Sequence, residues 1–250
     1  MIKGIEIFRD AFSGFADSYI LIGGAACDIQ LEQAGVPFRV TRDLDVVLCV
    51  ESLTPEFGRA FWRFIREGGY QIQQRAMGEK KFYRFRDPAT PDYPFMLELF
   101  SRDPLNFEIA RNSVLTPIPM EEEVSSLSAI LLNDEYYRFI RAHKTRADSV
   151  SLLSGEALIV LKAKAWLDLS ARKNAGEPID SKDIKKHKND VFRLFVSLPG
   201  DAAVALPPEI EQDMRLFLSR IQDEEIDLKA LRIKGRKAEI LAGLHRLFGI

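Results

Sequence analysis

Two pairs of residues near the start of the chain have the types and spacing for phosphate and metal chemistry. Gly23 and Gly24 end an apolar run at Tyr19–Ile22, and Asp43 and Asp45 open a second apolar run. A glycine pair after a buried strand lets the backbone approach a phosphate, and the first N–H groups of a following helix attract an anion. Residues i and i+2 of a strand share a face, so both aspartates can hold a hard divalent cation such as Mg2+. The pattern predicts a site for a nucleoside triphosphate and its metal.

Each half of this pattern also has an ordinary structural explanation. A Gly-Gly pair is commonly a turn, and Asp-x-Asp commonly caps a helix or ends a strand in solvent. The combined order of strand, Gly-Gly, helix, Thr41-Arg42-Asp43-Leu44-Asp45 and strand is more specific. It resembles the nucleotidyltransferase superfamily, which has a Gly-Gly usually followed by Ser or Thr, a strand with two metal-binding carboxylates, and a third acid on a later strand. This chain departs from the family at Ala25, which stands where the Ser or Thr is common.

A candidate for the third acid lies in the run Pro94–Phe100, which is apolar except for Glu98. An ionised carboxylate inside a buried strand needs a partner or a metal. Glu98 is therefore predicted as the third metal ligand or, if it does not bind metal, as the general base. The structural alternative is an ion pair with Arg84 or Arg86 on the preceding strand-like run.

Composition restricts the classes of function without choosing among them. The chain has 250 residues, 46% hydrophobic and 29% charged, with a net charge of −2. It can bury an ordinary core as one compact unit or two small ones, and it has no general electrostatic attraction for nucleic acid. It lacks an apolar run near 18 residues, so we expect a soluble, cytoplasmic protein with no membrane partner. Its three histidines argue against a His-based zinc site or a Ser-His-Asp hydrolase, and Cys27 and Cys49 lie in apolar surroundings typical of core residues.

Hydrophobic periodicity predicts an α+β protein with a strand-rich first half, including an α/β N-terminal region, and a helical second half. Expected strands are Tyr19–Ile22, Leu44–Val50, Tyr70–Gln74, Lys81–Phe85, Phe95–Phe100, Ser128–Leu132 and Ser149–Leu153. Expected helices are Ala25–Ala34, Pro55–Gly68, Glu135–Lys144, Glu156–Lys173, Ser181–Leu198, Glu209–Asp223 and Arg236–Phe248, with an amphipathic segment at Met1–Gly14. We place a boundary near residue 154, between a catalytic core at 1–154 and a helical domain at 155–250 that completes the active site.

The helix expected from Glu156 has an unusual member in its buried stripe. Lys162 lies among Leu158, Ala165 and Leu169 at helical spacing. Lysine is rarely buried without a partner. One explanation is that its ammonium snorkels to water; the other is that the ammonium binds a triphosphate. If it is uncompensated in the empty enzyme, Lys162→Met should keep or raise stability. Lys164 falls on another face and is expected to pair with Asp168.

The next expected helix presents acids along one face. Asp183, His187 and Asp190 are spaced i, i+4 and i+7. They can form an ordinary solvated flank, or Asp190 can reach Lys162 across two packed helices. The neighbouring lysines favour a solvated face, while remaining the best local candidate for binding a polyanion. These lysines are Lys182, Lys185, Lys186 and Lys188.

The two helical segments, Leu161–Trp166 and Ser181–Val191, resemble the C-terminal signature of AbiEii/AbiGii-type nucleotidyltransferases. These are the toxin halves of toxin–antitoxin and phage-defence modules, and the similarity covers roughly residues 18 to 198. The resemblance implies a nucleotidyltransferase-like mixed sheet flanked by helices. It also implies transfer of a nucleotidyl group from an NTP to an acceptor, in some members a tRNA end, and a cognate antitoxin as a partner.

Site roles follow from the resemblance position by position. The implied catalytic residues are Asp43, Asp45, Glu98, Lys162 and Asp190; the implied nucleotide-binding residues are Gly23, Gly24, Ala25, Arg42, Lys162, Lys164 and Asp183. The metal would be Mg2+, with Mn2+ as the alternative, held by Asp43, Asp45 and Glu98. Lys162 would bind the triphosphate, and Asp190 would bind the acceptor or the lysine.

Three hypotheses remain open from the sequence. The first is a toxin nucleotidyltransferase that acts on RNA such as tRNA. The second is a related transferase that modifies a small molecule or a protein hydroxyl. The third is a catalytically silent module that binds a nucleotide or RNA, for which Ala25 is the main argument.

Overall fold

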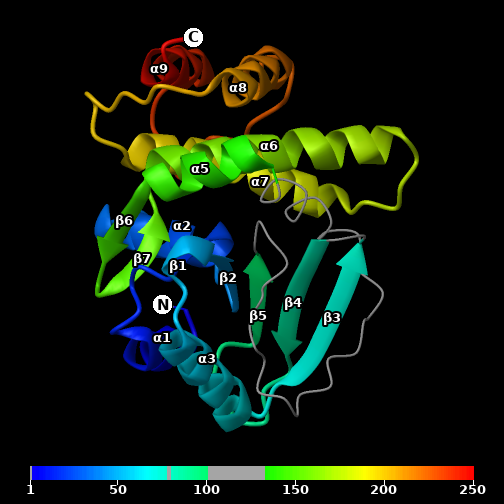
Figure 1. The fold of residues 1–250 in the computed structure, drawn as a ribbon. Helices are drawn as coiled ribbons and strands as arrows, with labels where there is room; N and C mark the ends of the chain where they lie inside the picture. The colour runs from blue at the N-terminus through cyan, green and yellow to red at the C-terminus, as the bar shows by residue number, and fades with distance from the viewer. Residues whose placement is uncertain (1, 78–79, 101–132) are drawn as a thin grey trace. The chain divides into compact units, whose positions relative to one another are not determined.

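The structure, a computed structural model, describes residues 2–77, 80–100 and 133–250 (Figure 1). The chain forms two compact units. The first, here called the sheet unit, contains Met1–Ile29 and Phe38–Leu153. The second, here called the helical unit, contains Gln30–Pro37 and Ser154–Ile250.

Within the described residues, the sheet unit is built on a seven-stranded mixed sheet with the order β3-β4-β5-β2-β1-β7-β6. The strands are β1 (Tyr19–Ile22), β2 (Asp43–Leu48), β3 (Gln71–Met77), β4 (Lys80–Arg86), β5 (Met96–Phe100), β6 (Lys144–Ala147) and β7 (Val150–Leu153). The pairs β2/β5 and β1/β7 are parallel, whereas the other neighbouring strands run antiparallel. β1 and β2 therefore lie in the middle of the sheet, where both faces can be covered.

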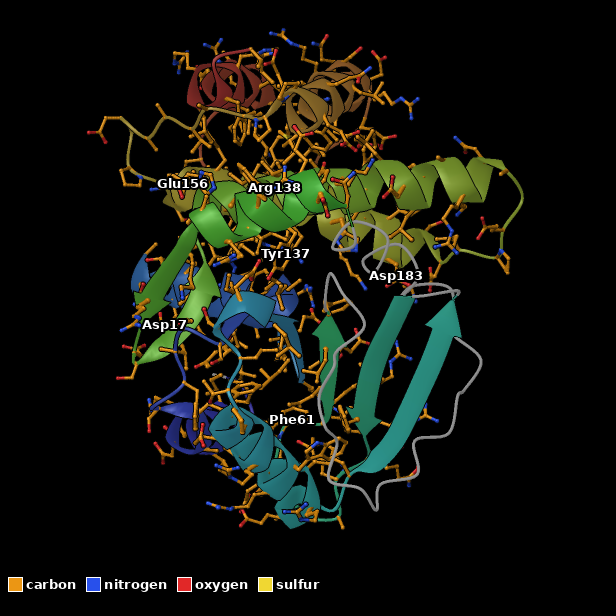
Figure 2. All side chains as sticks on the ribbon, viewed as in Figure 1. Asp17, Phe61, Tyr137, Arg138, Glu156 and Asp183 are labelled. Atoms are coloured by element: carbon orange, nitrogen blue, oxygen red, sulfur yellow. The ribbon has the colours of Figure 1, made fainter. Side chains whose placement is uncertain are left out.

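One face of this sheet is covered by α1 (Ile5–Phe12) and α3 (Pro55–Gly68) through aromatic contacts. The ring of Phe8 meets Tyr19 of β1 edge to face at 5.3 Å, and Phe61 meets Phe85 of β4 at 5.3 Å. Figure 2 labels Phe61 on α3. Because opposed residues of neighbouring strands share a face, the residues that alternate with Tyr19 and Phe85 point to the opposite face.

Local sequence explains where α3 begins and ends. The Thr54 side chain accepts a hydrogen bond from the Phe57 N–H, and Pro55 occupies the first turn. Gly69 ends the helix in the left-handed conformation with φ 64°. These are the ordinary stop and start signals of a helix, and the predicted range Pro55–Gly68 is confirmed.

Helix α2 (Gly23–Gln33) follows β1 with no intervening residue. The sequence predicts a helix from Ala25 after a turn at the glycine pair, but both glycines belong to the first helical turn. Gly23 has φ 67°, which lets the chain change direction between strand and helix in a single residue. The first N–H groups of a helix have no partner within the helix, and those of α2 consequently lie at the carboxyl end of β1.

A short hairpin follows α5 (Asp134–Ala142). The sequence predicts a helix through Lys144, whereas the helix ends before His143 and Lys144 opens β6. Asp148 and Ser149 make the turn to β7 with φ 47° and 65°. Non-glycine residues rarely adopt such angles, so the sequence contains no clear hairpin signal. The predicted strand Ser128–Leu132 lies outside the described residues.

The helical unit contains α6 (Gly155–Asn174), α7 (Ser181–Ser197), α8 (Pro208–Ile221) and α9 (Lys237–Phe248). Helix α6 packs against α7 and α8, and α7 also contacts α9. Trp166 of α6 meets Phe217 of α8 edge to face at 5.4 Å. A Cβ added at Gly243 would lie 2.2 Å from the Phe195 ring, so α9 needs a glycine to approach α7 closely.

The predicted fold class is confirmed. The protein is α+β, with a mixed sheet flanked by helices followed by a helical C-terminal half, an arrangement consistent with a nucleotidyltransferase-like fold. None of the described helices combines the length and apolar character needed to cross a lipid bilayer.

Candidate active site

Three charged side chains form a row across the face of β2, β5 and β4 that lies opposite α1 and α3. In the parallel pair β2/β5, Asp45 is opposite Glu98, and in the antiparallel pair β4/β5, Arg84 is opposite Glu98. Opposed residues share a face, so all three side chains project from the face opposite α1 and α3. Asp43 lies on this same face two residues before Asp45. We call Asp45, Glu98 and Arg84 the carboxylate row.

Glu98 is held on one side by a buried ion pair. The Arg84 guanidinium donates from Nε and Nη2 to Glu98 Oε1 at 2.6 and 2.5 Å. Their side chains are only 11% and 8% exposed. The alternative ion pair with Arg84 is therefore confirmed. This ion pair holds the Glu98 carboxylate in place on one side, and Asp45 lies on its other side.

Burial and the adjacent Asp45 carboxyl raise the pKa of Glu98 to about 8, against the opposing effect of the Arg84 charge. The two carboxyl groups lie side by side, because Asp45 is directly opposite Glu98 in the parallel pair β2/β5. Two carboxylates in contact cannot both remain ionised at low cost unless a proton or a cation lies between them. The donor set of the row thus fits a hard divalent cation, which prefers carboxylate oxygens.

The complete predicted ligand set is less compact than this pair. Over the part of the chain that the structure describes, no three His, Cys, Asp or Glu side chains converge closely enough to hold a metal ion. Asp43 shares the face with Asp45 and Glu98 but lies opposite Met96 in the ladder. Metal binding by Asp43, Asp45 and Glu98 stays a prediction, for which the Asp45–Glu98 contact is the structural argument.

Gly23 lies directly against the carboxylate row. A Cβ added at this position would be 1.7 Å from Asp45 Oδ2, a separation at which atoms overlap. The positive φ independently disfavours any other residue. Gly23 is needed both for the turn and for the close approach of α2 to Asp45. The first turn of a helix, with its partial positive charge, is thereby placed beside the acids.

The surroundings of Gly24 introduce two residues that the sequence prediction did not include. A Cβ at Gly24 would lie 2.7 Å from Thr41 Oγ1 and 3.6 Å from Arg39 Nη2. Thr41 precedes Asp43 and Asp45 at the same two-residue spacing, and this alternation is the signal that would have found it. Ala25 is fully buried on α2, whereas Arg42 is exposed.

In the helical unit, Lys162 and Asp190 form a buried pair between α6 and α7. Lys162 Nζ lies 3.5 Å from Asp190 Oδ2, with side chains 6% and 0% exposed. Arg193 Nη1 approaches Asp190 Oδ1 at 3.4 Å. The predicted contact from Asp190 to Lys162 is confirmed, and the snorkelling alternative is wrong. The expectation that Lys162 is uncompensated in the empty protein is also wrong, because Asp190 balances its charge.

The other predicted residues of this unit are also engaged in ion pairs. Lys164 Nζ lies 3.4 Å from Asp168 Oδ1, as predicted, and 3.2 Å from Asp213 Oδ2 on α8. Asp183, labelled in Figure 2, lies 2.7 Å from the ammonium of Lys186. These contacts give each side chain a structural role.

The four lysines of α7 do not form one continuous basic surface. Lys188 is buried and donates to the Glu224 carboxylate and to the Glu225 carbonyl, the latter at 3.1 Å. Lys186 pairs with Asp183, while Lys182 and Lys185 are exposed. The interpretation of this cluster as a wholly solvated face is wrong for Lys188, because its ammonium ties α7 to the segment after α8.

The structure therefore brings the predicted residues together in two groups. Gly23, Gly24, Asp43, Asp45 and Glu98 meet in the sheet unit, and Lys162 meets Asp190 in the helical unit. The use of both groups in one reaction stays a prediction from the sequence.

Comparison with known proteins gives a limited result. No family model matches this chain, and no curated protein matches it in sequence. Among solved structures, the chain is similar to an antigenic nucleotidyltransferase-like protein from Paracoccidioides brasiliensis. The identity is 18% and the TM-score 0.44, with 95% of this chain and 97% of that chain covered.

Proposed function

We propose that this protein is a metal-dependent nucleotidyltransferase that moves a nucleotidyl group from an NTP to an acceptor hydroxyl. The observation that carries the proposal is the contact between Asp45 and Glu98 at the point where Gly23 brings the start of α2 against Asp45. A carboxylate pair suits a divalent cation, and a helix N-terminus suits a phosphate. Metal–NTP binding requires both features side by side.

In the proposed reaction, the acceptor hydroxyl oxygen bonds to the α-phosphorus of the NTP. The bond from that phosphorus to the β-phosphate oxygen breaks, and pyrophosphate leaves. Mg2+, or Mn2+, held by Asp43, Asp45 and Glu98 would supply orientation of the attacking oxygen and neutralisation of the leaving group. If Glu98 does not bind metal, it takes the hydroxyl proton, with its orientation fixed by Arg84.

The residues of the helical unit enter the proposal through the family resemblance alone. It implies that Lys162 offsets charge on the β- and γ-phosphates and that Asp190 orients this lysine or the acceptor. The observed ion pair supports the second of these roles for Asp190, because a carboxylate 3.5 Å from the ammonium restricts its position.

The resemblance also supports the finer assignment of the acceptor as RNA such as tRNA. It supports a toxin of a toxin–antitoxin or phage-defence module with a cognate antitoxin. A specific observation favours a second candidate, a small-molecule or protein hydroxyl as acceptor. Lys186 and Lys188 of α7 are paired with acids, which weakens the best local candidate for an RNA contact. The buried Ala25 is the argument for a third candidate, a catalytically silent nucleotide- or RNA-binding module.

One experiment separates these candidates. The purified protein is incubated with Mg2+ and each labelled NTP in turn, with and without bulk tRNA, and label transfer and pyrophosphate release are measured. RNA-dependent transfer supports the RNA acceptor, and transfer to the protein itself or to an added small molecule supports the second candidate. Mg2+-dependent NTP binding without transfer to any acceptor supports the silent module.

The variant that tests the metal is Asp45→Asn. It keeps the side-chain volume and removes the negative charge in contact with Glu98. We expect Mg2+-dependent NTP affinity to be lost and turnover to fall by a factor of at least ~10^2, since a preorganised charge is removed. The thermal midpoint should hold or rise, because the like-charge contact is relieved. Unchanged Mg2+-dependent affinity would contradict metal binding at Asp45.

A further inference from the structure

The start of α2 has a second polar group besides Asp45. The Thr41 side chain is nine-tenths buried, and its hydroxyl has no hydrogen-bond partner among the described residues. Its Oγ1 lies 2.7 Å from the position that a Cβ of Gly24 would occupy. Among the described residues, the Thr41 oxygen is not one of the fully buried polar atoms that lack a partner, so it can be reached from outside the fold. Thr41 therefore has a hydroxyl available to a ligand at the first turn of α2.

A guanidinium and the positive end of a helix dipole lie near the same position. Arg39 Nη2 lies 3.6 Å from the Cβ position of Gly24, and its guanidinium lies over the Phe38 ring at 5.0 Å. The first-turn N–H groups of the eleven-residue helix α2 add the positive end of its dipole. A hydroxyl donor, a guanidinium and helix N–H groups are together the donors that proteins use for a phosphate group.

We propose that Thr41 is a phosphate-binding residue, whose hydroxyl donates to a non-bridging oxygen of the NTP triphosphate at the start of α2. This inference rests on the proposed function and extends it to a named contact. The lack of a side chain at Gly24 lets the Thr41 hydroxyl lie close to the first turn of α2, so that one phosphate group can contact both.

The test compares Thr41→Val, which keeps the shape and removes the hydroxyl, with Thr41→Ser, which keeps the hydroxyl and removes a methyl. Affinities for inorganic tripolyphosphate, for an NTP and for the corresponding nucleoside are measured by calorimetry in the presence of Mg2+. We expect Thr41→Val to weaken tripolyphosphate and NTP binding by about 10- to 100-fold, the usual effect of one hydrogen bond to a charged group. Thr41→Ser should bind nearly as well as the wild type. Nucleoside binding should be the same in all variants.

Two further variants test whether the loss of affinity is specific to the site beside Gly24. Thr145→Val on β6 is the matched control, because it makes the same exchange on a strand of the same sheet and should leave all affinities unchanged. Gly24→Ala places a methyl 2.7 Å from Thr41 Oγ1 in a backbone conformation that alanine tolerates. It should fold, as judged by its thermal midpoint, and lose tripolyphosphate affinity as Thr41→Val does.

The outcomes distinguish this inference from the proposed function. Equal tripolyphosphate affinities for Thr41→Val and the wild type would overturn the role of Thr41 while leaving nucleotidyl transfer in place. Loss of affinity in Thr41→Ser equal to that in Thr41→Val would also overturn it, because the hydroxyl would not be responsible. A wild type that binds tripolyphosphate through Thr41 but transfers no label from any NTP would support the phosphate site and contradict the proposed function.

Discussion

The carboxylate row of the sheet unit and the ion pairs around Asp190 in the helical unit differ in how their charges are arranged. In the carboxylate row, Asp45 contacts Glu98, and Arg84 binds Glu98 from the other side. In the helical unit, a single acid, Asp190, lies between Lys162 and Arg193. Glu98 and Asp190 are both buried, so the difference between the clusters does not come from the exposure of these two acids. The carboxylate row repeats negative charge, whereas the helical cluster repeats positive charge.

The comparison shows how to distinguish a binding cluster from a structural one. In the helical cluster, each charge has an opposite charge within 3.5 Å, so no ligand is needed to balance it. In the carboxylate row, burial and the adjacent Asp45 carboxyl raise the pKa of Glu98 to about 8. A fold that keeps such a contact gives up stability that a bound cation can restore.

The variant with the largest expected effect tests the contact between α2 and the carboxylate row. Gly23→Ala places a methyl 1.7 Å from Asp45 Oδ2 and forces alanine to φ 67°. We expect a loss of about 2–5 kcal/mol in the free energy of unfolding and a loss of nearly all transfer activity. Denaturant unfolding and label transfer measure the two effects.

A matched control separates strain from the clash. Gly35→Ala has almost the same backbone angle, φ 68°, but no atom within 4 Å of the added methyl. It should cost only about 1–2 kcal/mol and leave activity intact. Equal effects of the two substitutions would show that the approach of Gly23 to Asp45 is unimportant.

The next largest effect concerns the helical cluster. Lys162→Met removes the ammonium that lies 3.5 Å from the fully buried Asp190, while Arg193 Nη1 stays 3.4 Å from its other oxygen. We expect a destabilisation of roughly 3 kcal/mol, as for other buried ion pairs that lose one member. This reverses the expectation from sequence that stability would hold or rise. Thermal and denaturant unfolding measure it, and adding Asp190→Asn should recover part of the loss.

The role of Lys162 in the reaction is tested on the same samples. If it offsets charge on the triphosphate, turnover of the folded fraction should fall by at least ~10^2. Lys164→Met is the control, since Lys164 is 24% exposed and pairs with Asp168 and Asp213. It should cost about 1 kcal/mol or less and leave turnover near the wild-type value. A fully active Lys162→Met protein would leave the ion pair with a structural role only.

The smallest effect is a pH dependence that belongs to the carboxylate row. Because the pKa of Glu98 is raised from 4.5 to about 8 on folding, the folded state holds a proton that the unfolded state releases. The stability from this proton is present below pH 4.5 and is lost as the pH rises to about 8. Wild-type stability should fall relative to Glu98→Gln over that window.

The effect of Mg2+ on this pH dependence is a second test. A cation bound at the carboxylate row favours the ionised form of Glu98, so Mg2+ should reduce the loss of wild-type stability at high pH. Glu98→Gln should respond much less to Mg2+. Unfolding curves at several pH values with and without Mg2+ test both statements, and parallel pH profiles for the two proteins would contradict the raised pKa.

Local patterns along the chain were enough to predict most of the helices and strands and the acids of the candidate site. Strand β1 and helix α3 have the predicted bounds, because an uninterrupted apolar run and a capped, amphipathic segment are local signals. The spacing of Asp43 and Asp45 fixed their common face, since side chains of a strand alternate. Helical spacing placed Lys162 in a buried stripe, and burial of a lysine indicated that a partner was needed.

The partners of these groups depend on the three-dimensional fold. The choice of Arg84 for Glu98 depends on the register between β4 and β5, which hydrophobic alternation alone does not define across sequence-distant strands. The β6 strand was missed because its hairpin turn uses Asp148 and Ser149 at positive φ, without the usual glycine signal. The position of Thr41 beside Gly24 depends on how closely α2 approaches the chain before β2. Contacts of this kind join segments far apart along the chain, and packing, which no local pattern encodes, sets their distances.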